Sequence, residues 1–250
     1  ASCKTASCLL QDSLLPLARQ PLASCKTASC LLQDSLLPTP YTLIIMKKLA
    51  LFLLTFCLVF TAITTLAQTP PPDYFPLRVG SSWTYQTSSS AGGSVQFTIK
   101  VMSEELVEDS RIYKVETQSD AGLQTIQDWY SKPSGWVLTH RQAFPNNNQS
   151  VRYEPPRRSL KNPPSRGDTW EWSGTGMLGV DIQETSRVVE SESVRVPAGT
   201  FEAMKVETEM VQGGTPIKKT YWYANQVGFI KGIVDAGVFQ STSELLNYRQ

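Results

Sequence analysis

The chain has 250 residues, 41% of them hydrophobic and 18% charged, with a formal net charge of +1. All five cysteines precede residue 68, whereas residues 68–250 hold every glycine, every tryptophan and the only histidine, at a net charge of −2. These values exclude a basic nucleic-acid binder, a disulfide scaffold and any cysteine-based metal site in the later part of the chain.

Residues 1–45 contain a direct repeat. The string ASCKTASCLLQDSLLP stands at 1–16 and again, without one change, at 23–38. A structural repeat array needs at least three units, so two identical copies point to duplicated DNA. We expect residues 1–45 to be an upstream segment translated from a misplaced gene start, with a genuine Cys-rich leader as the alternative.

Residues 46–67 have the pattern of a secretory signal peptide. A positive Met-Lys-Lys start precedes an apolar run, and Thr65 and Ala67 suit the −3 and −1 positions of a cleavage site. We therefore expect export to the periplasm or the extracellular space, where the protein could associate with the outer envelope. The alternatives are an uncleaved membrane anchor and a lipoprotein with a lipidated Cys57. Only the uncleaved signal segment is expected to contact a membrane.

A Pro-rich lead-in at 68–73 precedes a domain at 74–250 in which apolar and polar residues alternate with a period of two. Such alternation predicts half-buried β-strands, and short turns between them favour antiparallel hairpins. The sequence thus predicts a mainly β fold: a single antiparallel domain of about ten strands, arranged as a barrel, a strongly curved sheet or a sandwich. The clearest alternating runs lie at 95–101, 113–117, 136–141, 204–207, 221–223, 229–234 and 238–246.

The stretch 155–164 has four prolines in ten residues and is predicted to be an edge or crossover loop. It separates two halves of the domain that open alike, with a glycine, a tryptophan three residues later and a further aromatic residue. This likeness suggests an internal repeat. The halves are 74–153 and 167–250, and the matched residues are Gly80 with Gly167, Trp83 with Trp170, and Tyr85 with Trp172.

Three phrases resemble a family of bacterial exported proteins. They are YFPLRVGSSWTY at 74–85, VPAGTFEA at 196–203, and YWYA followed by VGFIK within 221–231. Together they are similar to the 3108-like domain-of-unknown-function family, and the resemblance covers essentially all of 74–250. It implies a β-rich envelope protein, and it supplies no established activity and no catalytic residues.

Three motifs have simpler explanations than the chemistry they suggest. Residues 174–179 match the G-x-G-x-x-G string of dinucleotide-binding proteins, but the alternating residues that follow predict a glycine-rich hairpin instead of a helix. The Arg-Gly-Asp at 166–168 is expected to form a turn. His140 is expected on a strand surface, without the partners that catalysis or a metal would need. We therefore predict no catalytic residue, no metal site and no cofactor.

The aromatic residues carry the most functional information. Residues 68–250 contain 20 Trp, Tyr and Phe side chains, which either fill the interior or line a groove for an apolar or sugar ligand. Three of the tryptophans, Trp83, Trp170 and Trp222, are predicted to lie in strands, with at least two of them buried in one core. The candidate ligand-binding residues are Trp83, Tyr85, Trp170, Trp172, Tyr221, Trp222 and Tyr223.

These features favour a non-catalytic exported protein of the bacterial envelope that binds a lipid, a glycan or an envelope protein, and no nucleic acid. One alternative is a hydrolase of glycans or lipids, and another is a purely structural β-protein. An interior cavity lined by Trp and Tyr would favour binding, a cleft with two buried facing carboxylates would favour hydrolysis, and a filled interior would favour the structural role.

Overall fold

The computed structural model describes residues 41, 48, 70–120, 122 and 124–250. The chain divides into two compact units, Ala1–Gln68 and Thr69–Gln250, and nearly all of the described residues belong to the second. Apart from Tyr41 and Lys48, the predictions for the leader 1–45 and the signal segment 46–67 fall outside the described residues. Within the described part of the chain, no helix is long and apolar enough to cross a membrane.

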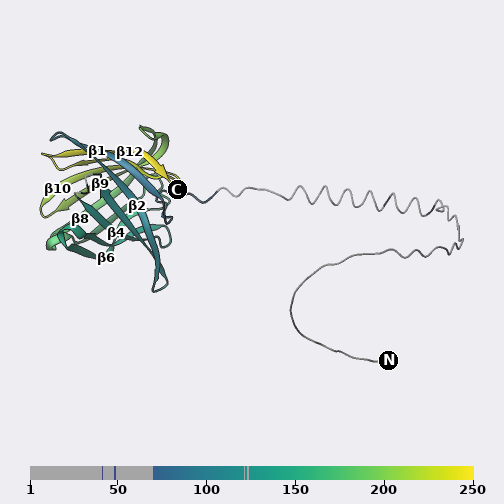
Figure 1. The fold of residues 1–250 in the computed structure, drawn as a ribbon, viewed down its shortest axis with the longest axis horizontal. Coiled ribbons are helices and arrows are strands. Elements are labelled where there is room, and N and C mark those ends of the chain that lie inside the picture. The colour runs from purple at the N-terminus through teal and green to yellow at the C-terminus, as the bar shows by residue number, and fades with distance from the viewer. Residues whose placement is uncertain (1–40, 42–47, 49–69, 121, 123) are drawn as a thin grey trace, which may run out of the picture. The chain divides into compact units, whose positions relative to one another are not determined.

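The second unit is one antiparallel sheet of twelve strands that curls into a nearly closed barrel (Figure 1). The predicted mainly β, antiparallel fold is therefore confirmed, with twelve strands where about ten were expected. Two short 3₁₀ turns, η1 and η2, interrupt the connections. In chain order the elements are β1 (Ser82–Ser89), β2 (Ser94–Val107), β3 (Ser110–Ser119), β4 (Thr125–Ser131), β5 (Trp136–Phe144), η1 (Pro145–Asn147), β6 (Gln149–Lys161), β7 (Thr169–Thr175), η2 (Met177–Gly179), β8 (Asp181–Val196), β9 (Gly199–Gln212), β10 (Thr215–Ala224), β11 (Gly228–Asp235) and β12 (Gln240–Arg249).

Strands that are consecutive in the chain are neighbours in the sheet, except that β1 pairs with β12 and β6 does not pair with β7. The sheet runs β6-β5-β4-β3-β2-β1-β12-β11-β10-β9-β8-β7, so the first strand pairs with the last. Figure 1 shows β1 beside the yellow β12. The two free edges, β6 and β7, are consecutive in the chain, and the gap between them is the seam of the barrel.

Side chains hold the β6–β7 seam together in place of a backbone ladder. The indole Nε1 of Trp170 donates to the main-chain oxygen of Arg158 at 3.0 Å, and that of Trp172 donates to the oxygen of Pro155 at 3.0 Å. Next to these bonds, the Lys161 ammonium lies 2.6 Å from the Asp168 carboxylate. Tryptophan N–H groups thereby satisfy carbonyl groups that an edge strand would otherwise leave unpaired.

The loop predicted at 155–164 needs correction. Residues 155–161 continue β6, and only 162–168 form the connection to β7. Pro155 and Pro156 have no N–H to donate, which would break a central strand but is tolerated in a strand whose neighbour is missing on one side. The edge character was therefore predicted correctly, whereas the absence of regular structure was not.

The structure supports the internal repeat. Strands β1–β6 and β7–β12 form two successive meanders of six strands each, and each opens with a glycine at positive φ: 90° at Gly80 and 88° at Gly167. In both places the glycine N–H donates to the carbonyl of a buried valine, and the N–H of that valine donates to the carbonyl of the residue after the glycine. These bonds are Gly80 N to Val101 O and Val101 N to Ser81 O, both 3.0 Å, and Gly167 N to Val188 O and Val188 N to Asp168 O, both 2.9 Å.

The second strand of each meander differs in polarity, since β2 is apolar where β8 is polar. The aromatic residues of β1 lie opposite apolar residues of β2, whereas the matching aromatic residues of β7 lie opposite polar residues of β8. One side of the barrel interior is consequently apolar and the other polar. The cross-strand pairs are Trp83 with Ile99, Tyr85 with Phe97, Trp170 with Ser186, and Trp172 with Glu184.

Trp83, Trp170 and Trp222 all lie in strands, as predicted, and expose 6%, 5% and 8% of their surfaces. Trp83 and Trp222 belong to one continuous hydrophobic cluster, and Trp170 belongs to a second. The prediction that at least two of them share a core is thus confirmed.

Candidate functional site

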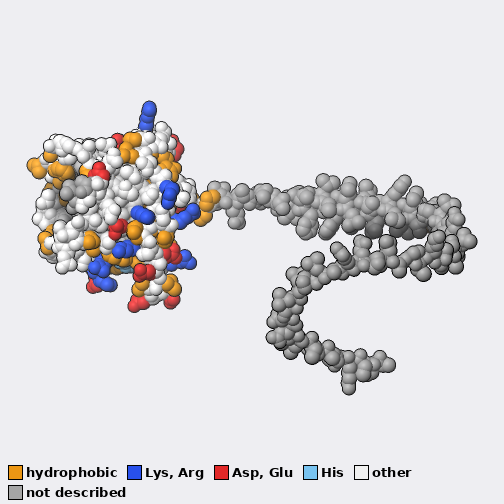
Figure 2. Space-filling view, in the orientation of Figure 1, with side chains coloured by type: hydrophobic (Ala, Val, Ile, Leu, Met, Phe, Trp, Pro, Cys, Tyr) orange, Lys and Arg blue, Asp and Glu red, His pale blue; other side chains and the backbone are white. Residues whose placement is uncertain are grey.

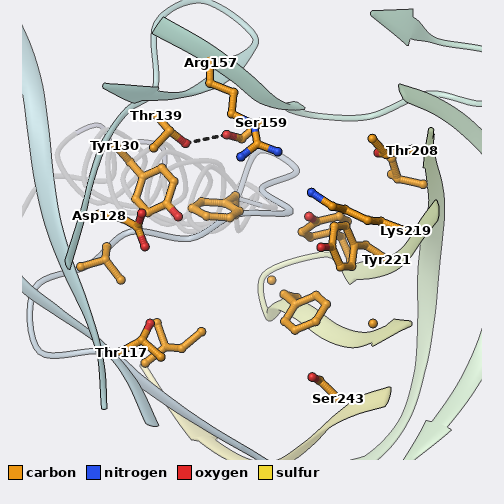
Figure 3. Close-up of a pocket in the computed structure, with 18 of the residues that line it drawn as sticks. Thr117, Asp128, Tyr130, Thr139, Arg157, Ser159, Thr208, Lys219, Tyr221 and Ser243 are labelled. Carbon is orange, nitrogen blue, oxygen red and sulfur yellow. Dashed lines mark hydrogen bonds between the residues drawn. The ribbon is translucent and has the colours of Figure 1, made fainter. Parts of the chain in front are cut away.

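The barrel contains a cavity of about 420 Å³ that is partly open to solvent. Its lining comes from strands on both sides of the barrel and from the segment before β1, which contributes Phe75, Pro76 and Leu77 (Figure 3). The volume falls within the range of roughly 300–1,000 Å³ that is usual for small-molecule sites. The interior is therefore only partly filled by side chains.

One wall of this cavity is apolar and aromatic. Trp83, Ile99 and Val115 line it from the first meander, and Phe229 lines it from β11. Tyr85 lies 5.2 Å from the Phe229 ring, centroid to centroid, and its hydroxyl donates to the Phe229 carbonyl at 2.8 Å. These contacts fix the rings in place and leave their exposed faces to the cavity.

The other wall carries short polar side chains that are paired with one another. The Thr139 and Ser159 hydroxyls form a hydrogen bond of 2.6 Å, which the dashed line in Figure 3 marks. In the same way, the Ser186 and Thr208 hydroxyls are 2.8 Å apart. Because each hydroxyl already has a partner, this wall can stay dry and still offer acceptors to a ligand.

A buried ion pair crosses the seam at this polar wall. Arg157 on β6 directs Nε to Glu184 Oε1 at 2.8 Å and Nη2 to Oε2 at 2.6 Å. The Glu184 side chain is only 4% exposed. A bidentate geometry of this kind is the arrangement in which a buried arginine and carboxylate compensate best for lost hydration.

Two further ionisable groups face the cavity from opposite sides. Asp128 on β4 is buried and accepts a hydrogen bond from Gln142 Nε2 at 3.0 Å, and burial raises its pKa to about 6. Lys219 on β10 is half-buried, and burial together with the nearby Arg157 lowers its pKa to about 8. Figure 3 shows the Lys219 amine and the Arg157 guanidinium pointing into the same space.

The tyrosines of the cavity act as neutral hydrogen-bonding groups. Burial raises the pKa of Tyr221 to about 12 and raises those of Tyr85, Tyr130 and Tyr223 well above the ordinary value. Their hydroxyls therefore stay protonated at any physiological pH. Since the Tyr85 hydroxyl already donates to the Phe229 carbonyl, the hydroxyls of Tyr130, Tyr221 and Tyr223 are the ones that can donate to a ligand without adding charge.

The seven candidate ligand-binding residues do not form one group. Four of them line the cavity: Trp83, Tyr85, Tyr221 and Tyr223. Trp172 instead lines a second hollow of about 630 Å³, beside Glu171, Met210 and Lys218. Neither space includes Trp170, which is part of the seam, or Trp222, whose ring lies near the Lys205 and Lys231 amines. Ligand binding by these residues stays a prediction.

The charged residues of the cavity were missed from the sequence. Lys219 follows the exposed Lys218 and precedes Tyr221 by two residues, so the alternation of β10 was a usable signal that it faces inward. Arg157 gave no such signal, because it follows two prolines in the segment predicted as a loop. Figure 2 shows side chains of both signs of charge interspersed on the face in view.

The other motifs take structural roles. The glycine-rich string at 174–179 connects β7 and β8, which form a hairpin as predicted. His140 lies on β5 with Nε2 at 2.7 Å from the Ser131 hydroxyl, and burial and Arg152 lower its pKa. Asp168 of the Arg-Gly-Asp string accepts a hydrogen bond from the Ser165 main chain at 2.7 Å, which closes a turn. Among the described residues, no group of three or more His, Cys, Asp or Glu is placed to hold a metal.

Part of the chain matches one family model, and two solved structures are similar to the chain. No curated protein matches the chain significantly. Two solved structures are similar at a TM-score of 0.48, each over 72% of this chain and 100% of the other. One is a candidate lipoprotein from Parabacteroides distasonis, 13% identical, and the other is a candidate exported protein with a YmcC-like fold from Bacteroides fragilis, 17% identical.

Residues 162–245 match the family model described as DUF3108-like. The matched segment begins just before β7 and ends in β12, so it spans nearly the whole second meander. The resemblance inferred from the sequence is therefore confirmed for residues 162–245, which are similar to the DUF3108-like family, and it stays a prediction for residues 74–161.

Proposed function

We propose that this chain is an exported protein of the bacterial envelope whose barrel holds one small apolar or amphipathic ligand. The observation that carries the proposal is the cavity of about 420 Å³, which has an aromatic wall on one side and a polar wall on the other. A protein with a purely structural role would not need this space, since closer packing of the same side chains would stabilise the barrel.

Export is supported by the sequence. The positively charged start, the apolar run and the small residue at Ala67 have the order of a secretory signal. Absence of cysteine after residue 67 means that the domain needs no oxidative folding step in the envelope. Periplasmic and extracellular destinations both fit these features.

A hydrolase is the alternative, because the cavity contains two buried carboxylates, Asp128 and Glu184. Asp128 has the raised pKa of a general acid. Both oxygens of Glu184, however, accept hydrogen bonds from Arg157, which removes the free carboxylate that a nucleophile or general base would need. The geometry thus favours binding over hydrolysis.

A fluorescence titration tests the binding proposal. N-phenyl-1-naphthylamine is a neutral probe whose emission rises in an apolar site, and we expect one molecule to bind per chain. Thr117 lines the cavity and Gln118, the next residue of β3, is exposed. Thr117→Trp should weaken binding at least tenfold by filling the cavity, whereas Gln118→Trp should leave it unchanged. Absence of binding by the unaltered protein, or equal binding by both variants, would contradict the proposal.

A further inference from the structure

The charge inside the cavity is unevenly compensated. Arg157 has Glu184 as its bidentate partner, and Asp128 is hydrogen-bonded to Gln142. Among the described residues Lys219 belongs to none of the ion pairs, and the hydrogen bond that its Nζ forms there goes to the thioether sulfur of Met210, at 3.2 Å. A thioether is a weak acceptor, so the ammonium lacks the partner that a partly buried cation needs.

The surroundings of Lys219 further destabilise its charged ammonium form. Its amine and the Arg157 guanidinium point into the same space, and the repulsion from Arg157 outweighs the attraction from Glu184. Burial acts in the same direction and favours the neutral amine. An anion bound beside Lys219 would offset both effects, because its charge would stabilise the ammonium form.

The cavity also has a place for an apolar chain. The apolar and aromatic wall, which includes Trp83, Ile99 and Phe229, lines the same cavity as Lys219. At about 30 Å³ for each small group, a space of this size accepts on the order of 14 non-hydrogen atoms. That is the size of one single-chain amphiphile, and a lipid with two long chains would not fit.

From this arrangement we infer that the cavity selects a single-chain amphiphile with an anionic head, which binds Lys219 while the chain lies against the aromatic wall. This inference rests on the proposed function and narrows it to one ligand class. A carboxylate and a phosphate head share the required chemistry, since each presents oxygen acceptors and negative charge to the ammonium.

Displacement of N-phenyl-1-naphthylamine from the full chain tests the inference. The competitors are dodecanoate, dodecyl phosphate, dodecanol and dodecyltrimethylammonium, which share a chain and differ in the head. We expect dodecanoate to compete at least tenfold more strongly than dodecanol, and the cationic amphiphile to compete least. The ratio of dodecyl phosphate to dodecanoate then distinguishes the two anionic heads.

A matched pair of variants locates the head. Lys219→Met keeps the length of the side chain and should reduce the preference for dodecanoate over dodecanol to about one, while dodecanol still binds. Lys218→Met removes the same charge from the outward-facing neighbour and should keep the preference. Thermal unfolding followed by circular dichroism shows whether each variant is folded.

Equal competition by dodecanoate and dodecanol in the unaltered protein would overturn the anionic head and leave the proposed function standing. Loss of the preference in Lys218→Met instead of Lys219→Met would place the head outside the cavity and overturn the inference as well. A protein that fails to bind the neutral probe at all would contradict the proposed function itself.

Discussion

Replacing Asp128 by Asn should stabilise the protein at neutral pH. The carboxyl group is 8% exposed and accepts a hydrogen bond from Gln142, which an amide oxygen at the same position can also accept. Its charged form is disfavoured by burial, so the folded chain binds a proton with a pKa of about 6 in place of 3.8. Because the amide carries no charge, the variant avoids the cost of ionising this group inside the barrel.

The size and the sign of the effect follow from this pKa. The folded state keeps the proton between pH 3.8 and about pH 6, where the unfolded state has already released it. The free energy of unfolding therefore falls as the pH rises through this window, by up to about 3 kcal/mol from this one group. Asp128→Asn should match the unaltered protein near pH 3.5 and exceed its stability by up to about 3 kcal/mol near pH 7.5.

Urea unfolding followed by tryptophan fluorescence at several pH values measures the difference. Asp181→Asn is the control, since Asp181 is exposed on β8 and the substitution removes the same charge from the protein surface. If the gain of Asp128→Asn does not increase from pH 3.5 to pH 7.5, or if the variant is less stable at neutral pH, the assignment of a buried, poorly compensated carboxyl group is wrong.

Two further substitutions test the seam and its ion pair. Trp170→Phe keeps an aromatic ring but removes the N–H that donates to the Arg158 carbonyl. This substitution should lower the free energy of unfolding by about 1–3 kcal/mol. An unchanged urea midpoint would show that the indole hydrogen bond does not stabilise the seam. Glu184→Gln leaves the Arg157 guanidinium buried without its counter-charge and should cost about 3–5 kcal/mol, measured in the same way. A cost below 1 kcal/mol would mean that water already compensates Arg157.

The fold was predictable to the extent that alternation marks strands. Trp83 and Trp170 stand in runs where burial alternates, and such runs identify strands without any knowledge of their neighbours. The course of β6 was not predictable, because Pro155 is compatible with a strand only if that strand lies at an edge. Edge position is a property of the whole sheet, and the local sequence does not contain it.

Four of the seven aromatic residues predicted from the sequence line the cavity, whereas its charged residues were not predicted. Tyr221 and Tyr223 were identified because large aromatic side chains on one face of a strand must be covered. Arg157 and Glu184 are 27 residues apart and meet only because the seam brings β6 close to β8. The alternation of β10 places Lys219 on the same face as Tyr221, but only the curvature of the barrel shows that this face lines a cavity.

The central claim is that the barrel carries a ligand, and native mass spectrometry of the protein purified from its own envelope without detergent tests it most directly. The account predicts one species heavier than the bare polypeptide by a single small amphiphile, released on collisional activation, and loss of that species in Thr117→Trp. A bare polypeptide in every preparation, with no uptake of added dodecanoate or dodecanol, would contradict the account.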